Sequence, residues 1–299
     1  MRNPIISIKS RLRYQWIKHH PKQWAEQLFI KEFGRPINWD NPITMPEKGR
    51  WIQFFTDTSL WPLYADKYRV REVLNGEGYF MPQLYGVWHN AQKIDFDSLP
   101  NSFVLKTNHG SGEVVVVKEK SKINKAEIIE KMQKFLHTPY GVMTAESHYL
   151  RIKPCIVAEQ LLENTCPVSS SIVDYKFFCS FGIPFMIDVC YDRNPTTHKA
   201  YENIYNADWE PMHYYNRWEY PKKNLPCPAS YNKMIELCKE LVSGFPLIRL
   251  DFYDVNGKPY IGEFTLTPSA FDRDNLTEQG LLEMGKYIDL SRIPKSMLK

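Results

Sequence analysis

Residues 247–266 read LIRLDFYDVNGKPYIGEFTL, and this stretch decides the fold class of the chain. Two runs rich in β-branched and aromatic residues, 247–255 and 259–266, are typical of strands. They are separated by Asn256-Gly257, a strong short-range signal for a hairpin turn. The sequence therefore predicts an antiparallel strand pair here.

Charged residues follow both strands of this predicted hairpin. Alternation along a strand places Arg249 and Asp251 on one face, and antiparallel pairing can bring Glu263 and Thr265 beside them. Two converging carboxylates can hold Mg²⁺ through oxygen ligands and leave coordination positions for phosphate oxygens. A surface salt bridge of Arg249 with Asp251 or Glu263 would explain the same residues, so the hairpin alone leaves both alternatives open.

A small polar loop lies earlier, between the strand-like runs 103–106 and 114–117. It reads Lys106-Thr107-Asn108-His109-Gly110-Ser111-Gly112. Without bulky side chains, backbone N–H groups can approach phosphate oxygens, and a lysine at the end of the preceding strand can neutralise their charge. The loop lacks the GKS/T ending and the following helix of a P-loop. Taken alone, it is better explained as a glycine-rich hairpin turn.

A third group of residues lies between these two. Glu159-Gln160-Leu161-Leu162 follows a strand of the buried type, so its exposed backbone can read an adenine edge, and Asp174-Tyr175-Lys176 brings a second lysine at the start of the next strand. Arg193, after Tyr191-Asp192, is a candidate to hold an anionic acceptor or a phosphate, or is a surface turn residue.

Elsewhere, periodicity predicts helices over 46–55, 65–74, 122–136 and 233–242, and a strand hairpin over 174–191. The sequence shows no internal repeat and no low-complexity linker.

Bulk composition excludes several classes of protein. The chain has 299 residues, of which 43% are hydrophobic, which is enough for a sizeable core. A formal net charge of +4 is too small to indicate, by itself, that the protein binds nucleic acid. The six cysteines include no CxxC pair and are expected to be mostly buried free thiols. With no signal-peptide core and no run of about 20 apolar residues, the protein is expected to be cytoplasmic.

The first 31 residues are locally basic, with seven lysines and arginines against Glu26 and with Trp16, Trp24, Leu28 and Phe29 interleaved. A helix packed on the domain by its aromatic face, with a solvated basic side, explains this pattern best. A helix lying on an anionic membrane at the inner face is the alternative.

In combination and in this order, these features resemble the ATP-grasp ligases. The match is closer still to the TupA-like group, which is encoded among genes for teichuronopeptide and other surface polysaccharides. The resemblance covers nearly the whole chain after the basic segment, and it rests on Asn38-Trp39-Asp40-Asn41-Pro42, Glu47-Lys48, Ala65-Asp66-Lys67-Tyr68-Arg69-Val70-Arg71, Phe103-Val104-Leu105-Lys106-Thr107-Asn108-His109-Gly110-Ser111-Gly112, Asp174-Tyr175-Lys176-Phe177-Phe178, Arg249-Leu250-Asp251-Phe252-Tyr253 and Gly262-Glu263-Phe264-Thr265-Leu266-Thr267-Pro268.

The resemblance implies an α+β ATP-grasp fold, in which two α+β subdomains clamp ATP behind an N-terminal helical segment. The segments would be 1–60, basic and helical; 61–100, the N-terminal part of the ligase; 101–162, the first subdomain with the glycine loop; and 163–299, the second with the metal site. The resemblance further implies three groups of residues around ATP. The phosphates would be contacted by Lys106 and Lys176 and covered by Gly110, Ser111 and Gly112, and Arg249 would steady the transferred phosphoryl group. Adenine and ribose would be lined by Glu159, Gln160, Leu161 and Leu162, and Mg²⁺ would be held by Asp251, Glu263 and Thr265. His109 is expected to contact a phosphate or to cap the loop. Many ATP-grasp enzymes have asparagine where this chain has Thr265, and a hydroxyl ligates magnesium more weakly.

The implied activity is ATP-dependent joining of a carboxylate to an amine through an acylphosphate. The carboxylate would belong to a uronic-acid glycan or its precursor, or to an amino acid, and the amine would come from an amino acid or another amine. A glycosyltransferase is the competing hypothesis, and its metal site would need an Asp-x-Asp motif at Asp95-Phe96-Asp97 or Asp272-Arg273-Asp274. Neither follows a convincing nucleotide-binding strand. A non-catalytic nucleotide-binding subunit is a third hypothesis.

Overall fold

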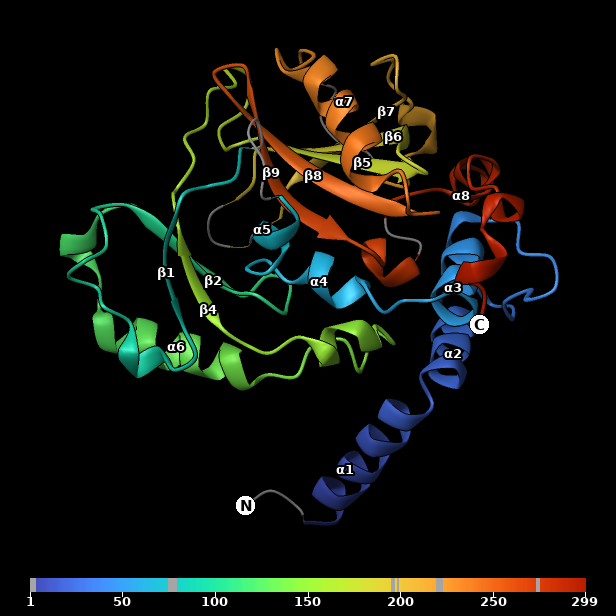
Figure 1. Ribbon diagram of the computed structural model, residues 1–299, viewed down its shortest axis with the longest axis horizontal. Helices are drawn as coiled ribbons and strands as arrows, with labels where there is room; N and C mark the ends of the chain where they lie inside the picture. The colour runs from blue at the N-terminus through green and yellow to red at the C-terminus, as the bar shows by residue number, and fades with distance from the viewer. Residues whose placement is uncertain (1–3, 75–79, 195–196, 198, 219–222, 273–274) are drawn as a thin grey trace.

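The computed structural model describes residues 4–74, 80–194, 197, 199–218, 223–272 and 275–299. These residues form two antiparallel sheets, one of four strands and one of five, together with helices that pack against them (Figure 1). This arrangement confirms the expected α+β class.

The four-stranded sheet and one helix form the smaller hydrophobic core. The helix α6 (Lys125–His137) begins at Asn124, whose side chain accepts a hydrogen bond from the backbone N–H of Glu127. Its apolar stripe is buried against the sheet, since Ile128 and Met132 belong to the same core as Leu105. In spatial order the strands are β1 (Leu84–Trp88), β4 (Ile156–Glu159), β2 (Phe103–Thr107) and β3 (Val114–Val117).

The five-stranded sheet carries the larger core. The helix α7 (Tyr231–Val242) packs against it, and its buried Met234 and Leu237 share one core with Phe177 and Leu250 of the sheet. In spatial order the strands are β7 (Tyr201–Tyr205), β6 (Ile183–Tyr191), β5 (Asp174–Ser180), β8 (Ile248–Val255) and β9 (Lys258–Thr265).

The predicted hairpin of residues 247–266 is confirmed as β8 and β9. Both turn residues adopt the left-handed backbone that this turn requires, with φ of 53° at Asn256 and 76° at Gly257. The register pairs Arg249 with Thr265 and Asp251 with Glu263. The turn chemistry thus fixes which charged residues face each other.

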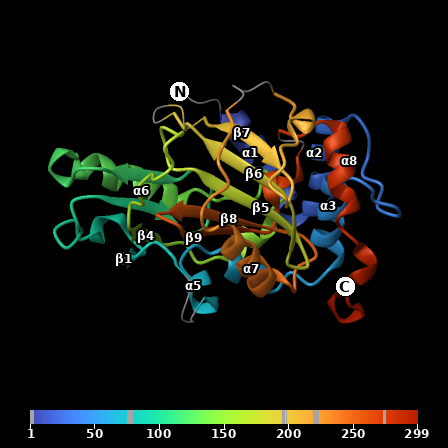
Figure 2. The same ribbon diagram turned by 90° about the horizontal axis from the view of Figure 1, so that it is seen from above.

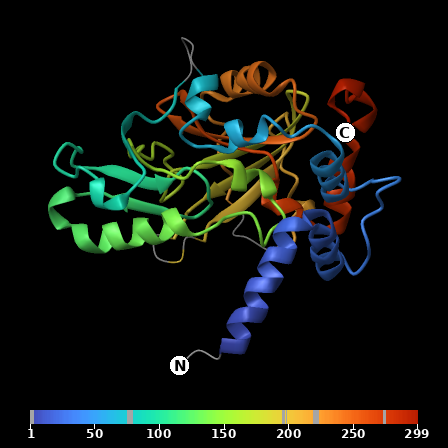
Figure 3. The same ribbon diagram turned by 60° about the horizontal axis from the view of Figure 1, so that its bottom comes forward.

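The N-terminal helices are α1 (Pro4–His19), α2 (Pro21–Phe33) and α3 (Met45–Phe55). Helix α1 projects from the body (Figures 1 and 3). Of its residues 11–19, only Ile17 is fully buried, whereas α2 packs through Trp24 and Phe29. The packed alternative therefore describes α2 well and α1 poorly.

Helix α3 lies beside α8 (Glu278–Lys286), at the opposite end of the molecule from α6 (Figure 2). Lys48 ties the two together, because its Nζ donates to the carbonyl oxygens of Gly285 and Ile288 at 2.8 and 2.7 Å. These contacts hold the chain's two terminal regions together.

The helix expected over 65–74 is wrong in its extent. The chain instead forms α4 (Trp61–Ala65), a turn, and α5 (Val70–Val73). Asp66 causes the break, because its Oδ1 accepts hydrogen bonds from the backbone N–H groups of Tyr68 and Arg69.

All six cysteines are free thiols, with Cys227 exposed and four of the others buried. Among the described residues no helix is long and apolar enough to cross a membrane.

Candidate active site

A cluster of charged side chains occupies one face of the five-stranded sheet. Lys176 of β5 lies directly opposite Asp251 of β8, which in turn lies opposite Glu263 of β9. The guanidinium of Arg249 grips both oxygens of Asp251, with Nε to Oδ1 at 2.7 Å and Nη2 to Oδ2 at 2.8 Å. The Nζ of Lys176 lies 3.0 Å from Asp251 Oδ2. Four of the predicted site residues are thus brought together by strand register.

Two further residues border this cluster at the start of β5. Lys176 Nζ donates a short hydrogen bond to Asp174, so it bridges two carboxylates. Arg193, which follows β6, lies 3.9 Å from Asp174 Oδ2, and 42% of its side chain is exposed. The structure therefore places Arg193 at the margin of the cluster, beside the second lysine.

Charge pairing inside the cluster governs its protonation. Burial acts to raise the pKa of Asp251, but Arg249 and Lys176 outweigh it, and the pKa lies below the ordinary range. For Glu263, burial is likewise outweighed by Lys67 and the pKa is lowered. Both carboxylates are therefore charged at neutral pH. Burial raises the pKa of Asp174, whose Lys176 partner opposes that shift only in part.

The donor set of this face fits a magnesium ion. Asp251 and Glu263 offer charged oxygens, and Thr265 adds a hydroxyl two residues beyond Glu263. Thr265 is only 7% exposed, and its Oγ1 has no hydrogen-bond partner among the described residues. A buried hydroxyl without a partner is costly, so a ligand that it can contact resolves the deficit.

Lys106 lies on the other sheet, where it is held by a buried carboxylate. Glu159, at the end of β4, is 2% exposed and receives Lys106 Nζ at 2.5 Å and Arg71 Nη2 at 2.8 Å. Burial acts to raise the pKa of Glu159, but Lys106 and Arg71 outweigh it and lower the pKa. The Glu159 carboxylate therefore positions the first lysine of the predicted site.

The glycine loop has the small, unusual backbone that the sequence suggests. Gly112 has a φ of 75°, in the left-handed region, and a Cβ at Gly110 would lie 2.5 Å from Glu113 Oε2. Ser111 is exposed, while His109 is 4% exposed and its Nε2 lies 3.4 Å from the carbonyl oxygen of Thr138. Burial lowers the pKa of His109, so a neutral, packed imidazole occupies this position.

The segment after β4 leaves the sheet in an extended form. Gln160, Leu161 and Leu162 are half-buried, and the Gln160 N–H donates to the carbonyl oxygen of Gln83 at 2.9 Å. The Gln83 N–H in turn donates to Gln160 Oε1 at 3.3 Å, and these two hydrogen bonds fix the direction in which the segment leaves the end of β4.

Lys67, for which the sequence analysis gave no role, joins the two sheets. Its Nζ donates to the Gly110 carbonyl oxygen at 2.7 Å and to Glu263 Oε1 at 2.8 Å. Arg71, four residues further on, contacts Glu159. The sequence offered one indication of these roles, because Lys67 and Arg71 are four residues apart in a predicted helix. Their partners could not be predicted, since Glu263 is 196 positions from Lys67 and Glu159 is 88 positions from Arg71.

The first of the two Asp-x-Asp alternatives has both carboxylates engaged in local contacts. Asp95 caps a turn, because its Oδ1 accepts from the backbone N–H groups of Asp97 and Ser98. Asp97 pairs with Lys125 at 2.8 Å. Of the second motif, Arg273 and Asp274 lie outside the described residues.

Comparison with known proteins gives a family match. The model of the family described as TupA-like ATPgrasp matches residues 53–289 of the chain. No curated protein matches the sequence.

Solved ligase structures are similar at low identity. The D-alanine–D-alanine ligase of Bacillus anthracis in complex with ATP is 17% identical, with a TM-score of 0.45 over 77% of this chain and 64% of that one. The D-alanine–D-alanine ligase of Helicobacter pylori is 15% identical, with a TM-score of 0.41 over 82% and 69%. Phosphoribosylamine–glycine ligase of Thermotoga maritima is 14% identical, with a TM-score of 0.43 over 73% and 52%. The chain therefore spans less than two thirds of the first of these ligases.

Proposed function

Because the chain belongs to the TupA-like ATP-grasp family, we propose that it is a magnesium-dependent, ADP-forming carboxylate–amine ligase. The observation that carries this proposal is the row of Lys176, Asp251 and Glu263 across three neighbouring strands, with Arg249 clamped on Asp251. In this proposal residues 101–162 and 163–299 form the two subdomains that enclose ATP.

The lysines and Arg249 act on the triphosphate by charge and position. Lys106 and Lys176 contact the phosphates from the two sheets, and Arg249 steadies the γ-phosphoryl group as its charge spreads during transfer. Gly110, Ser111 and Gly112 approach the phosphates through backbone N–H groups. Glu159 holds Lys106 in place, and Gln160, Leu161 and Leu162 line adenine and ribose.

Asp251, Glu263 and Thr265 would hold the magnesium ion. Bound there, the ion offsets negative charge on the β- and γ-phosphates. The two carboxylates are each held by a cation, Arg249 for Asp251 and Lys67 for Glu263, so their oxygens are already oriented. The salt bridges offset part of the cost of keeping these charges partly buried.

The reaction needs no nucleophilic side chain. An oxygen of the substrate carboxylate attacks the γ-phosphorus, and ADP leaves. The amine lone pair then attacks the acyl carbon, the carbon–oxygen bond to phosphate breaks, and the nitrogen loses one proton as phosphate departs. The product is an amide, and the phosphate carries one oxygen from the carboxylate.

We assign the carboxylate to a uronic acid of a surface polysaccharide or its precursor, and the amine to an amino acid. The gene context of the TupA-like group supports this assignment. The basic helix α1, whose residues 11–19 are mostly exposed, supports peripheral contact with an anionic membrane, where a lipid-linked acceptor would be found.

Isotope transfer tests the ligase directly. Uronic acids labelled with ¹⁸O in the carboxylate are incubated with ATP, Mg²⁺ and a panel of amino acids. The expected result is ADP, an amide and ¹⁸O-labelled inorganic phosphate. Lys106→Ala should suppress the label, whereas the exposed Lys118→Ala should not.

The competing glycosyltransferase gives the opposite outcome. Transfer of sugar from a nucleotide donor, with no label passing from carboxylate to phosphate, would refute the ligase assignment.

A further inference from the structure

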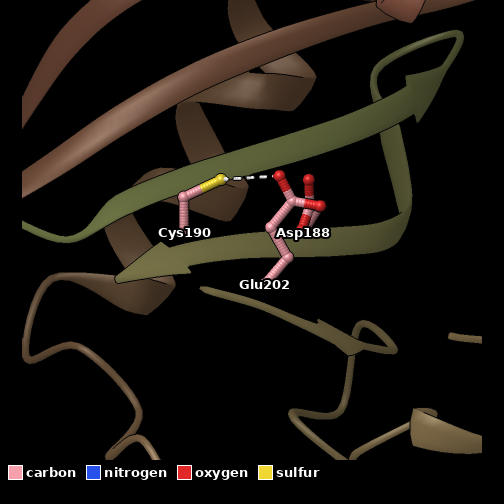
Figure 4. Close-up of side chains that lie close together, drawn as sticks. All are labelled: Asp188, Cys190 and Glu202. Atoms are coloured by element: carbon pink, nitrogen blue, oxygen red, sulfur yellow. Dashed lines mark hydrogen bonds between the residues drawn. The ribbon is translucent and has the colours of Figure 1, made fainter. Parts of the chain in front are cut away.

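The charged face continues past Lys176 onto β6. Asp188 lies directly opposite Lys176 in the strand register, so it projects from the same face as Asp251. Cys190, two residues on, lies opposite Glu202 of β7. Figure 4 shows Asp188, Cys190 and Glu202 gathered together, and one ligand atom of each lies within 4.8 Å of the others.

A small cavity opens beside Asp188. Its polar lining comes from Asp188, Ser269, Asp272 and Asn275, and apolar side chains, among them Phe178, complete the wall. Its volume of about 20 Å³ holds one group of the size of a water molecule. The cavity therefore fits the head of a small polar group and nothing larger.

Asn275 indicates that something polar belongs in this cavity. The side chain is only 5% exposed, and neither its Oδ1 nor its Nδ2 has a hydrogen-bond partner among the described residues. A buried amide without partners is costly and rare in folded proteins. A hydrogen-bonding ligand in the cavity would satisfy it.

The wall opposite the sheet is held in a strained shape. Ser269, Ala270 and Phe271 have φ values of 49°, 51° and 55°, which side chains other than glycine seldom adopt. The fully buried Arg50 holds this run, since its Nη2 donates to the Ala270 carbonyl oxygen at 2.5 Å. The surrounding structure thus keeps these residues in a backbone conformation that would be unfavourable without it.

The chemistry of the cavity favours an ammonium group over a metal ion. Asp188 and Asp272, which line the cavity, are acceptors of positive charge, and Asn275 Oδ1 can accept an N–H as well. Burial raises the pKa of the Cys190 thiol well above its ordinary range, and the thiol lies 3.8 Å from Glu202 Oε1 as a hydrogen-bond donor. A protonated thiol is a poor metal ligand.

We propose that this cavity, the amine pocket of Asp188, Asp272 and Asn275, binds the primary ammonium group of the amine substrate. The inference rests on the ligase proposal and extends it to the class of amine. Asp188 is two strands from Asp251, about 10 Å across the sheet. An amine held there lies beside the phosphoryl-transfer cluster. Transfer of one ammonium proton to the Asp188 carboxylate would free the nitrogen lone pair for attack on the acyl carbon, and the apolar wall limits the first carbon of the amine to a small, unbranched group.

Binding of ethanolamine and choline tests the pocket. They share a charge and a hydroxyl, but only ethanolamine has ammonium N–H groups to donate. Titration calorimetry is run on the full chain with Mg²⁺ and a non-hydrolysable ATP analogue. The wild type should bind ethanolamine about 10-fold more tightly than choline. Asp188→Asn should lower the affinity for ethanolamine about 10-fold, as expected for loss of a charge-assisted hydrogen bond.

Two further variants keep the test decisive. Asn275→Leu, which removes the amide at similar volume, should also weaken ethanolamine, and it decides the matter if Asp188→Asn fails to fold. The exposed Asp208→Asn should bind like the wild type. Equal affinity for the two compounds, or unchanged ethanolamine binding in either folded pocket variant, overturns the amine pocket. Failure of the wild type to bind the ATP analogue at all refutes the ligase proposal instead.

Discussion

Replacing Glu159 by glutamine removes one negative charge from the four-stranded sheet and leaves the side-chain volume almost unchanged. In the native protein this carboxylate is 2% exposed and holds two cations, Lys106 at 2.5 Å and Arg71 at 2.8 Å. Glutamine can accept one hydrogen bond through its oxygen, but its amide nitrogen then faces the second cation. We expect Glu159→Gln to fold and to be less stable.

The size of the effect follows from the exposure of the two partners. Removing one member of a buried ion pair costs about 3–5 kcal/mol when the other charge is left without solvent. Lys106 and Arg71 are 16% and 21% exposed, so both can turn partly toward water. The expected loss falls to about 2 kcal/mol, near the value of one hydrogen bond to a charged group, and the thermal midpoint should fall by about 4 °C.

Urea unfolding followed by circular dichroism measures the loss, and its pH dependence tests the cause. The folded pKa of Glu159 is below its ordinary value, because Lys106 and Arg71 outweigh the effect of burial. Its contribution to stability is therefore complete above about pH 5 and is lost as pH falls through the lowered pKa. The difference in the free energy of unfolding between the wild type and Glu159→Gln should therefore become smaller in acid.

Glu163→Gln is the matched control, because Glu163 is exposed four residues further along the chain. It should change stability by less than about 0.5 kcal/mol. A Glu159→Gln protein as stable as the wild type at pH 7, or a gap that stays constant in acid, would refute the reasoning.

The other predictions concern the metal site, the loop and helix α1. Asp251→Asn and Glu263→Gln should each abolish magnesium-dependent ADP release with an unchanged circular dichroism spectrum, and near-normal turnover in both would exclude the metal site. Gly112→Ala should lower the free energy of unfolding in urea by about 1 kcal/mol, because a φ of 75° costs alanine about that much, while Gly244→Ala, with no heavy atom within 4 Å of its added Cβ, should not. Sedimentation with anionic vesicles should show binding that weakens with salt, since screening acts over about 10 Å at 0.1 M; no binding at low salt would eliminate membrane contact.

The parts of the fold that sequence predicts well are those fixed by neighbours in the chain. The Asn256-Gly257 turn sets the register of β8 and β9, so alternation alone places Asp251 opposite Glu263. The helix over 65–74 was missed in extent because one side chain, Asp66, satisfies two backbone N–H groups that a continuous helix would have used. The hydrophobic pattern of a segment does not reveal side-chain hydrogen bonds that compete with the helix for its backbone N–H groups.

The parts that sequence could not predict depend on distant pairing. Asp188 joins the charged face only because β6 pairs with β5 in a register that sets it opposite Lys176. Arg71 reaches Glu159 through packing of α5 beside the four-stranded sheet, 88 positions away. Asn275 is an ordinary loop residue in the sequence, and only its burial without partners distinguishes it.

The double contact of Lys67 has a thermodynamic consequence. One ammonium group is bonded at once to the glycine loop, through the Gly110 carbonyl oxygen, and to Glu263. A cation arriving at Glu263 competes for the same carboxylate and so frees Lys67, which loosens its hold on the loop. By linkage, any ligand that draws the loop away from Lys67 must raise the affinity of Glu263 for that cation by the same factor. Nucleotide and metal would then bind cooperatively through a single exchanged lysine, in addition to any direct contact between the ion and the phosphates.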